Sequence, residues 1–336
     1  MRYRYVCMFG FHHNFSDGTT NMKFCDIFLS LLNDVLQNKI LDLSEVGRFA
    51  HPIQDDLANS ISSYFYLTRL FLTRIYNFFI CYGSYVSNFL KHYPMLPGKN
   101  VCTMVLENEL NEFATQCLLK RCRMEGVTLN TAFTAAANIG MYRMILQKDA
   151  SILETSFDSQ QIINMRRYWP KEKQKDSFGC HIFPTYIHVT TKKEDIAEFW
   201  EYARKVHKIM YKELDVDKNS IKSHPLSHKL CLALFINFCA SKLKLTTTNE
   251  SHYCITNMGN VSSKFSGDGK VVSASKVLRS VSCHLMPTLC QHTLQTFKGK
   301  LYYSLDYYPF KMSEDTARTY ASSLMDTLRN AIHLPN

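Results

Sequence analysis

The chain opens with an apolar segment, a polar turn and an amphipathic helix. Residues 3–11 are mostly apolar, aromatic or β-branched, which predicts a strand. The polar residues 12–18 form a turn, after which Thr19 and Thr20 can cap a helix. Apolar residues recur at three- and four-residue spacing over 21–36, which is typical of one helix face. The predicted order is strand, turn, helix.

The rest of the chain alternates between helical and strand-like patterns, and Lys298-Gly299 predicts a tight turn between the last two strands. Predicted helices cover 110–125, 129–146, 194–213, 225–243 and, after the cap Ser313, 314–332; predicted strands cover 101–106, 162–165, 183–189, 253–256, 281–286, 291–297 and 300–306. This mixture predicts an α/β or α+β fold. Proline and glycine over 94–100 predict a boundary between an N-terminal part, 1–97, and a larger C-terminal part, 98–336.

An aromatic stretch over 67–90 is long enough to cross a bilayer. Arg69 and Arg74 lie inside it, and a central arginine costs several kcal/mol in lipid. We therefore expect a buried helix. The alternative is an amphipathic helix within 61–93 that lies on a membrane surface and makes the protein membrane-peripheral.

Composition and charge narrow the class of protein. Of 336 residues, 46% are hydrophobic and 20% charged, which predicts a packed core rather than disorder. The net charge of +10 fits nucleic acid, an anionic membrane or an anionic small ligand, but the basic residues are scattered and no nucleic-acid-binding motif occurs. We therefore expect no nucleic-acid partner. The 12 cysteines form no CxxC pair and the 13 histidines add no metal-ligand spacing, so we expect no metal and a reducing, cytoplasmic compartment.

The turn from residue 12 to residue 18 carries the strongest candidate chemistry. A histidine at the mouth of a tight turn can accept a proton from a hydroxyl or amine. Asp17 could orient that histidine directly, or could lock the loop by pairing with an arginine elsewhere. Gly18 permits a backbone angle that other residues disfavour. An Asp-Gly pair is also common in ordinary turns, and the histidine pair lacks a third metal ligand.

The pattern His12-His13-x-x-x-Asp17-Gly18 resembles the HHxxxDG motif of the coenzyme A-dependent acyltransferase superfamily. That superfamily includes chloramphenicol and alcohol acetyltransferases and the condensation domains of peptide synthetases. The resemblance implies that His13 is the general base and that Asp17 pairs with a downstream arginine. It continues in order along the chain through residues 118–130, Asn164 to Arg167 with Pro170 and Phe178-Gly179, Thr256 to Gly259, and 297–307.

The resemblance implies a two-lobed sandwich of mixed sheets and helices, like chloramphenicol acetyltransferase. It implies acyl transfer from acyl-CoA, as co-substrate, to a small alcohol or amine, without a covalently bound cofactor and in a monomer. Arg166, or its neighbour Arg167, would pair with Asp17; Asn257 and Gly259 would lie near the oxyanion or the tunnel. No serine or cysteine is recognisable beside a base, which favours direct transfer.

The position of the motif raises an alternative. It begins at residue 12, whereas in the family it lies well inside the N-terminal lobe, so we expect that lobe to be incomplete. The chain could then be a truncated or degenerate relative that binds a ligand or partner without catalysis. Residues 306–310 do not match the motif of the plant branch, which favours the alcohol acetyltransferase or condensation-domain branch.

Overall fold

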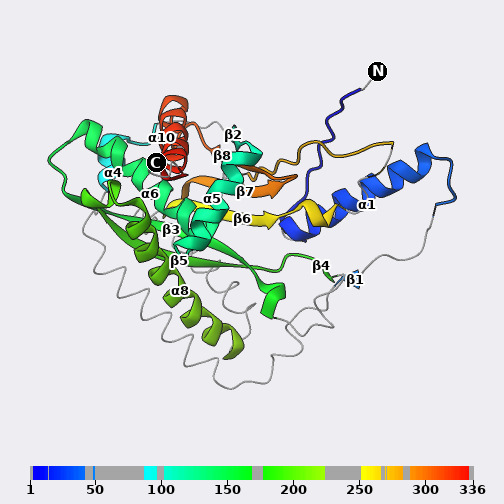
Figure 1. Ribbon diagram of the computed structural model, residues 1–336, viewed down its shortest axis with the longest axis horizontal. Helices are drawn as coiled ribbons and strands as arrows, with labels where there is room; N and C mark the ends of the chain where they lie inside the picture. The colour runs from blue at the N-terminus through cyan, green and yellow to red at the C-terminus, as the bar shows by residue number, and fades with distance from the viewer. Residues whose placement is uncertain are drawn as a thin grey trace, which may run out of the picture.

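A six-stranded mixed sheet organises the fold, with strand order β2-β8-β7-β6-β3-β5 (Figure 1). The computed structural model describes residues 3–13, 15–41, 48–49, 87–96, 102–168, 177–223, 251–265, 269, 271–282 and 288–332. The strands of this sheet are β2 (Met104–Leu110), β3 (Glu154–Asn164), β5 (Ile182–Lys192), β6 (Ser251–Asn260), β7 (Thr288–Phe297) and β8 (Lys300–Tyr307). A separate short pair joins β1 (Arg48–Phe49) to β4 (Ser177–Phe178).

The sheet combines parallel and antiparallel pairs. β6 runs parallel to both β3 and β7, while β8 is antiparallel to β7 and β2, and β5 is antiparallel to β3. The β7–β8 hairpin turns through Lys298 and Gly299, whose φ angles of 46° and 79° are those of a tight turn matched to strand twist. The predicted turn is confirmed.

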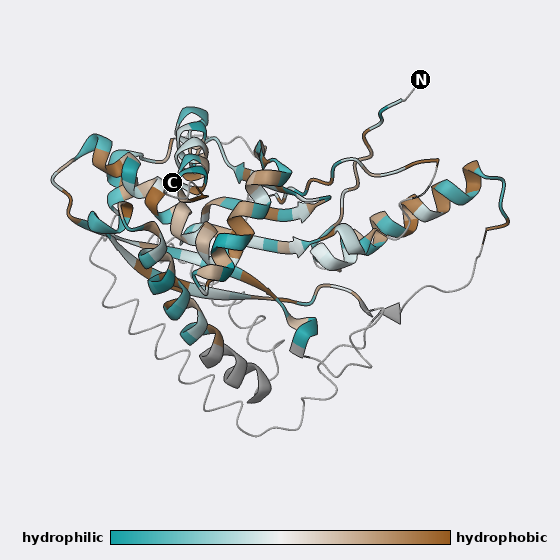
Figure 2. Ribbon diagram, in the orientation of Figure 1, coloured by the Kyte–Doolittle hydropathy of each residue, from teal (hydrophilic) through white to brown (hydrophobic). Residues whose placement is uncertain are grey.

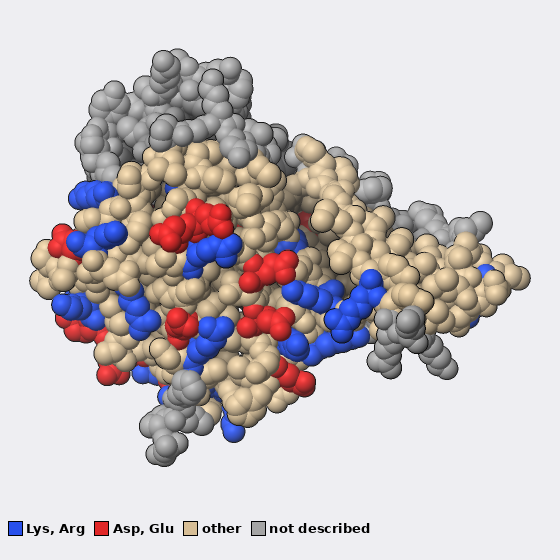
Figure 3. All heavy atoms as spheres, turned by 90° about the horizontal axis from the view of Figure 1, so that it is seen from above, with Lys and Arg blue, Asp and Glu red and all other residues tan. Residues whose placement is uncertain are grey.

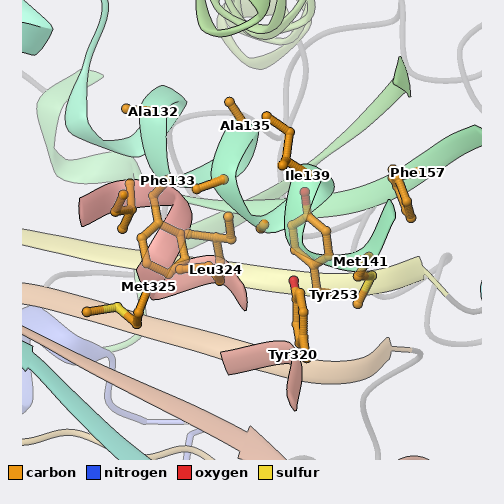
Figure 4. Close-up of a cluster of buried hydrophobic side chains, with 14 of the residues drawn as sticks. Ala132, Phe133, Ala135, Ile139, Met141, Phe157, Tyr253, Tyr320, Leu324 and Met325 are labelled. Atoms are coloured by element: carbon orange, nitrogen blue, oxygen red, sulfur yellow. The ribbon is translucent and has the colours of Figure 1, made fainter. Parts of the chain in front are cut away.

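Helices cover one face of the sheet and enclose the main core. They are α4 (Asn88–His92), α5 (Glu112–Met124), α6 (Leu129–Lys148), α8 (Phe199–Ser223) and α10 (Glu314–Ile332). Fourteen of the side chains of this core are drawn in Figure 4, where Phe133 of α6 and Tyr320 of α10 point toward the strands. Gly140 of α6 lets α10 approach closely, because a Cβ there would lie 3.2 Å from the backbone nitrogen of Leu324. Burial of this apolar face is the main stabilising contribution.

Helix α1 (Gly18–Leu36) stands apart from that helical layer (Figure 1). It contributes Met22 and Leu29 to a second, smaller core that also contains Phe265 and Phe297. Near its other end, the Asn33 side chain donates to the Val272 carbonyl (2.9 Å) and accepts from the Val272 N–H (2.9 Å). Polar contacts therefore hold α1 as well as apolar ones.

The mixed α/β class is confirmed, as are most of the predicted helices. The helix predicted over 314–332 has those bounds, and the Ser313 hydroxyl accepts from the Thr316 N–H (3.2 Å). β3 is much longer than the strand predicted over 162–165, because polar residues in its first half alternate between the two faces. The helix predicted over 225–243 and the stretch over 61–86 lie outside the described residues.

The strand predicted over 3–11 is wrong. These residues run as an extended segment that joins none of the sheets that the structure describes. Phe9 and Phe11 instead pack edge-on against Phe24 of α1, with ring centroids 5.3 and 5.0 Å apart. The strand predicted over 281–286 is not formed at its described residues, 281–282. The division into 1–97 and 98–336 stays a prediction.

Candidate active site

The motif loop leads directly into α1. Asp17 is the N-cap residue, and its Oδ1 accepts from the Thr20 N–H (3.0 Å). Asp17 and Gly18 are buried, His13 is half-buried and the side chain of His12 is exposed. The two histidines therefore differ: His12 stacks on Phe15 at the surface, whereas His13 faces inward.

Asp17 pairs with Arg166 rather than orienting His13. Its Oδ2 lies 2.6 Å from Nη1 of Arg166 and 2.8 Å from the backbone nitrogen of His181. Both side chains are buried, at 1% and 6% exposure. Burial alone would raise the pKa of Asp17, but hydrogen bonds from Arg166, Thr20 and His181 lower it below its ordinary value. The carboxylate is therefore charged and serves to hold the loop.

Arg166 joins three segments that are distant in sequence. It lies in the 3₁₀ helix η1 (Met165–Tyr168), directly after β3. Its Nη2 donates to the Thr20 hydroxyl (3.0 Å) and to the Gly179 carbonyl (3.1 Å), and the Thr20 hydroxyl also contacts the Gly179 backbone. The start of α1, the end of β3 and the approach to β5 are thus fixed together. Arg167, the other predicted partner, is exposed and lines a cavity instead.

A cysteine that the sequence did not single out lies beside His13. Sγ of Cys180 is 3.4 Å from Nδ1 of His13, across 167 positions of sequence. No local motif could have revealed a pair at that separation. Burial and, next, the charge of Asp17 raise the pKa of Cys180 to about 11. The group is a neutral thiol at neutral pH, which does not fit a thiolate nucleophile.

His13 lines a cavity of about 70 Å³ between the motif loop and the sheet. The opposite wall comes from β6 and β7, through Thr256, Asn257 and Gln291. The complete lining is His13, Asp17, Gly18, Thr19, Ile162, Asn164, Arg167, Ile182, Thr256, Asn257, Met258, Arg279 and Gln291. Segments that are far apart in the sequence, from His13 to Gln291, therefore meet at one small, partly polar cavity.

Gly18 is required for space and not for an unusual backbone angle. Its φ is outside the left-handed region, so the reason given by the sequence was wrong. A Cβ at this position would lie 2.5 Å from Sδ of Met258 and 2.9 Å from Nη1 of Arg279. The helix can approach β6 this closely only because residue 18 has no side chain.

Of the two residues predicted near the oxyanion, only Asn257 lines the cavity. Its Oδ1 accepts from the Gly259 N–H at 2.8 Å, so that backbone donor is already used. Gly259 has φ of +67° and lets β6 turn, which explains a glycine there.

Charged residues do not form a metal site in the described part of the chain, where no group of three or more histidine, cysteine or acidic side chains is placed to hold an ion. Figure 3 shows acidic and basic side chains interspersed over the face seen from above. Basic side chains gather where the projecting arm, which contains α1, joins the rest of the molecule. The net charge of +10 therefore does not give this face a uniformly basic surface.

A family profile that matches most of the sequence gives the family of the chain. The profile of the alcohol acetyltransferase family matches residues 3–271, which include the motif loop, Arg166 and the end of β6. The chain belongs to the alcohol acetyltransferase family. No curated protein sequence matches the chain.

Solved structures give the same fold. The trichothecene 15-O-acetyltransferase of Fusarium sporotrichioides aligns with a TM-score of 0.66 at 16% identity, over 95% of this chain and 65% of that one. The acyl transferase PapA2 aligns with a TM-score of 0.58 at 11% identity, over 96% of this chain and 64% of that one. The first condensation domain of the calcium-dependent antibiotic synthetase aligns with a TM-score of 0.59 at 12% identity, over 96% of this chain and 63% of that one. This alcohol acetyltransferase family member thus has the fold of acyltransferases and condensation domains, and spans about two thirds of these chains.

Within the residues that the structure describes, no helix combines the length and the apolar character needed to cross a membrane. The aromatic segment that raised this question lies mostly outside those residues, so the peripheral contact predicted for 61–93 stays a prediction.

Proposed function

We propose that the protein transfers an acyl group from acyl-CoA to an alcohol or amine, with His13 as general base. One observation carries the proposal: His13 lines a cavity beside a loop that the buried Asp17–Arg166 pair holds in place. A base that is fixed in position next to a cavity can act on a substrate hydroxyl with little loss of orientation. Acyl-CoA serves as co-substrate, and the site needs no bound cofactor.

The reaction would proceed without a covalent enzyme intermediate. His13 accepts the proton of the acceptor hydroxyl as its oxygen attacks the thioester carbonyl carbon. The tetrahedral oxyanion collapses, the carbon–sulfur bond breaks, and the imidazolium returns its proton to the leaving thiolate. The raised pKa of Cys180 supports this direct route over a cysteine acyl-enzyme.

Cys180 would act as a positioning residue for the base. If Nδ1 of His13 carries the hydrogen and donates it to Sγ of Cys180, Nε2 is left as the proton acceptor. Fixing one tautomer in this way is what a carboxylate does in other histidine-based sites. Here the family's carboxylate, Asp17, is committed to Arg166.

Two side chains on the opposite wall could stabilise the oxyanion. Asn257 uses its Oδ1 for the Gly259 N–H, which leaves its Nδ2 as a donor. The Thr256 hydroxyl accepts from Nε2 of Gln291 (3.3 Å), so its own hydrogen is available to a ligand. Both line the cavity with His13, and donors that are already oriented are effective at a developing negative charge.

The test compares His13→Ala with His12→Ala, a matched change at the exposed neighbour. Release of free thiol from acetyl-CoA and several longer acyl-CoA thioesters is followed with 1-butanol and butylamine as acceptors. His13→Ala should lower kcat by about 10²- to 10⁴-fold, while His12→Ala stays within a few-fold of the wild type. Equal rates for wild type and His13→Ala would contradict the assignment.

The alternative is a relative that binds an acyl thioester without turning it over. A rise in melting temperature with acetyl-CoA, together with no thiol release for any acceptor, would support this second function.

A further inference from the structure

Gln291 is a buried polar residue on the central strand β7. All ten residues of this strand are buried, and successive side chains point to opposite faces of the sheet. His292 faces the helices, where its ring lies 5.4 Å from that of Phe133. Gln291 therefore lies on the other face, is 1% exposed and lines the His13 cavity.

The amide of Gln291 is held at one end and unsatisfied at the other. Nε2 donates to the Thr256 hydroxyl at 3.3 Å. Oε1 is buried and has no hydrogen-bond partner among the groups that the structure describes. A buried acceptor without a partner is costly, so in a cavity of this kind it points to a ligand that supplies a donor.

The chemistry at the reacting centre restricts which group can supply that donor. A thioester carbonyl offers only acceptors, and the hydroxyl that reacts gives its proton to His13. Gln291 and His13 line the same cavity, so the donor to Oε1 is a second group of the substrate close to the reacting one. Arg167 and Arg279 also line the cavity and disfavour another cation. A neutral hydroxyl fits better than an ammonium group.

We propose that Gln291 selects acceptor alcohols that carry a second hydroxyl adjacent to the reacting one, by accepting a hydrogen bond from it at Oε1. The substrate class is thus a 1,2-diol unit, as in a polyol or a sugar. The inference rests on the proposed acyl transfer at His13 and adds the acceptor specificity of the same site.

The experiment compares two acceptors of equal chain length, 1,2-butanediol and 1-butanol, with acetyl-CoA as donor. The wild type should show a kcat/KM at least about tenfold higher for the diol, the size of preference expected when a buried acceptor would otherwise lose its partner. Gln291→Met keeps the side-chain length and removes the acceptor, so the ratio should fall to within about twofold of one.

Gln295→Met is the matched control. Gln295 lies on the same face of β7, is buried and also has an unpartnered Oε1, but it does not line the cavity. Its variant should keep the diol preference. Melting temperatures of both variants check folding. If Gln291→Met does not fold, binding of the two alcohols to His13→Ala by calorimetry replaces it, and tighter binding of the diol is expected.

The outcomes separate the two proposals. No diol preference in the wild type, with active acyl transfer, would overturn the role of Gln291 and leave the proposed function intact. No thiol release with any acceptor would overturn both. If Gln291→Met raises KM for acetyl-CoA equally with both alcohols, the donor is an amide N–H of the coenzyme A arm, which also overturns the diol assignment.

Discussion

Helices α1 and α10 both have 19 residues, yet the protein uses them in opposite ways. α10 buries Tyr320, Leu324 and Leu328 completely against α6 and the sheet. α1 leaves Phe24 41% exposed and Val35 52% exposed, and Figure 2 shows hydrophobic residues along this projecting arm. Apolar packing positions α10, whereas polar contacts at Asp17 and Asn33 contribute much of what positions α1. The candidate active site is attached to the second kind of helix.

Breaking the Asp17–Arg166 pair should have the largest effect on stability. Asp17→Asn leaves the Arg166 guanidinium buried without its counter-charge, so we expect a loss of about 3–5 kcal/mol in the free energy of unfolding. The pKa of Asp17 is lowered in the folded state, so its contribution is present above pH ~4 and is lost as pH falls further. Urea unfolding should therefore separate variant and wild type at pH 7, and the difference should shrink as the pH falls below about 4. A constant difference across this range would contradict the charge-based role.

Truncating one apolar residue on each helix tests the comparison directly. Leu324→Ala removes a fully buried side chain of α10 and should cost about 2–5 kcal/mol. Phe28→Ala on α1, where the ring is 37% exposed, should cost less. Denaturant unfolding of the two variants provides the measurement. Equal losses would show that α1 depends on apolar packing as much as α10 does.

Asp306 gives a pH dependence opposite in sign to that of Asp17. Burial raises the pKa of Asp306 to about 7. The Val281 N–H, Ser280 and Arg279 lower this pKa, but their combined effect is smaller than that of burial. The folded state then binds a proton more tightly than the unfolded state, so stability should fall as pH rises from about 4 to about 7 and level off above. Asp306→Asn should remove this slope, because the side chain no longer titrates. Asp326→Asn, at an exposed position on α10, is the control and should leave the slope unchanged.

The smallest effect is expected at Cys180. Cys180→Ala removes the contact with Nδ1 of His13 and should lower kcat by about two- to tenfold with little change in KM. Cys180→Ser should restore much of kcat, because a serine hydroxyl can accept from Nδ1 of His13 in place of the thiol. Cys117→Ala, on α5, is the control. A kcat for Cys180→Ser no higher than that of Cys180→Ala would remove Cys180 from the site.

The sequence predicted those parts of the fold in which local pattern and burial agree. The helix over 314–332 has a cap, a regular apolar stripe and a matching buried face, so its bounds were predictable. The segment over 3–11 has the composition of a strand, but strand formation depends on a partner, and its aromatic rings pack on α1 instead. Local strand propensity contains no information about which tertiary partner a segment packs against.

The site was predictable only where a motif carries it. The pairing of Asp17 with Arg166 or Arg167 followed from a family pattern, and the structure selects Arg166 because the side chain of Arg167 is exposed. Gln291 and Cys180 belong to no motif, and a polar residue inside a strand is ordinarily expected to face solvent. Their roles depend on which side of the sheet they occupy and on contacts across most of the chain.

The polar contacts of Asp17 and Asn33 hold α1 near both of its ends. Asp17 and Asn33 are roughly 24 Å apart along a straight helix. A rod held at one end can pivot, but a rod held at two points keeps its direction, and His13 lies just beyond the first support. Between the two supports, Phe24 and Phe28 also pack against the segment that leads to His13, whereas an exposed position such as Leu31 can change without moving the base.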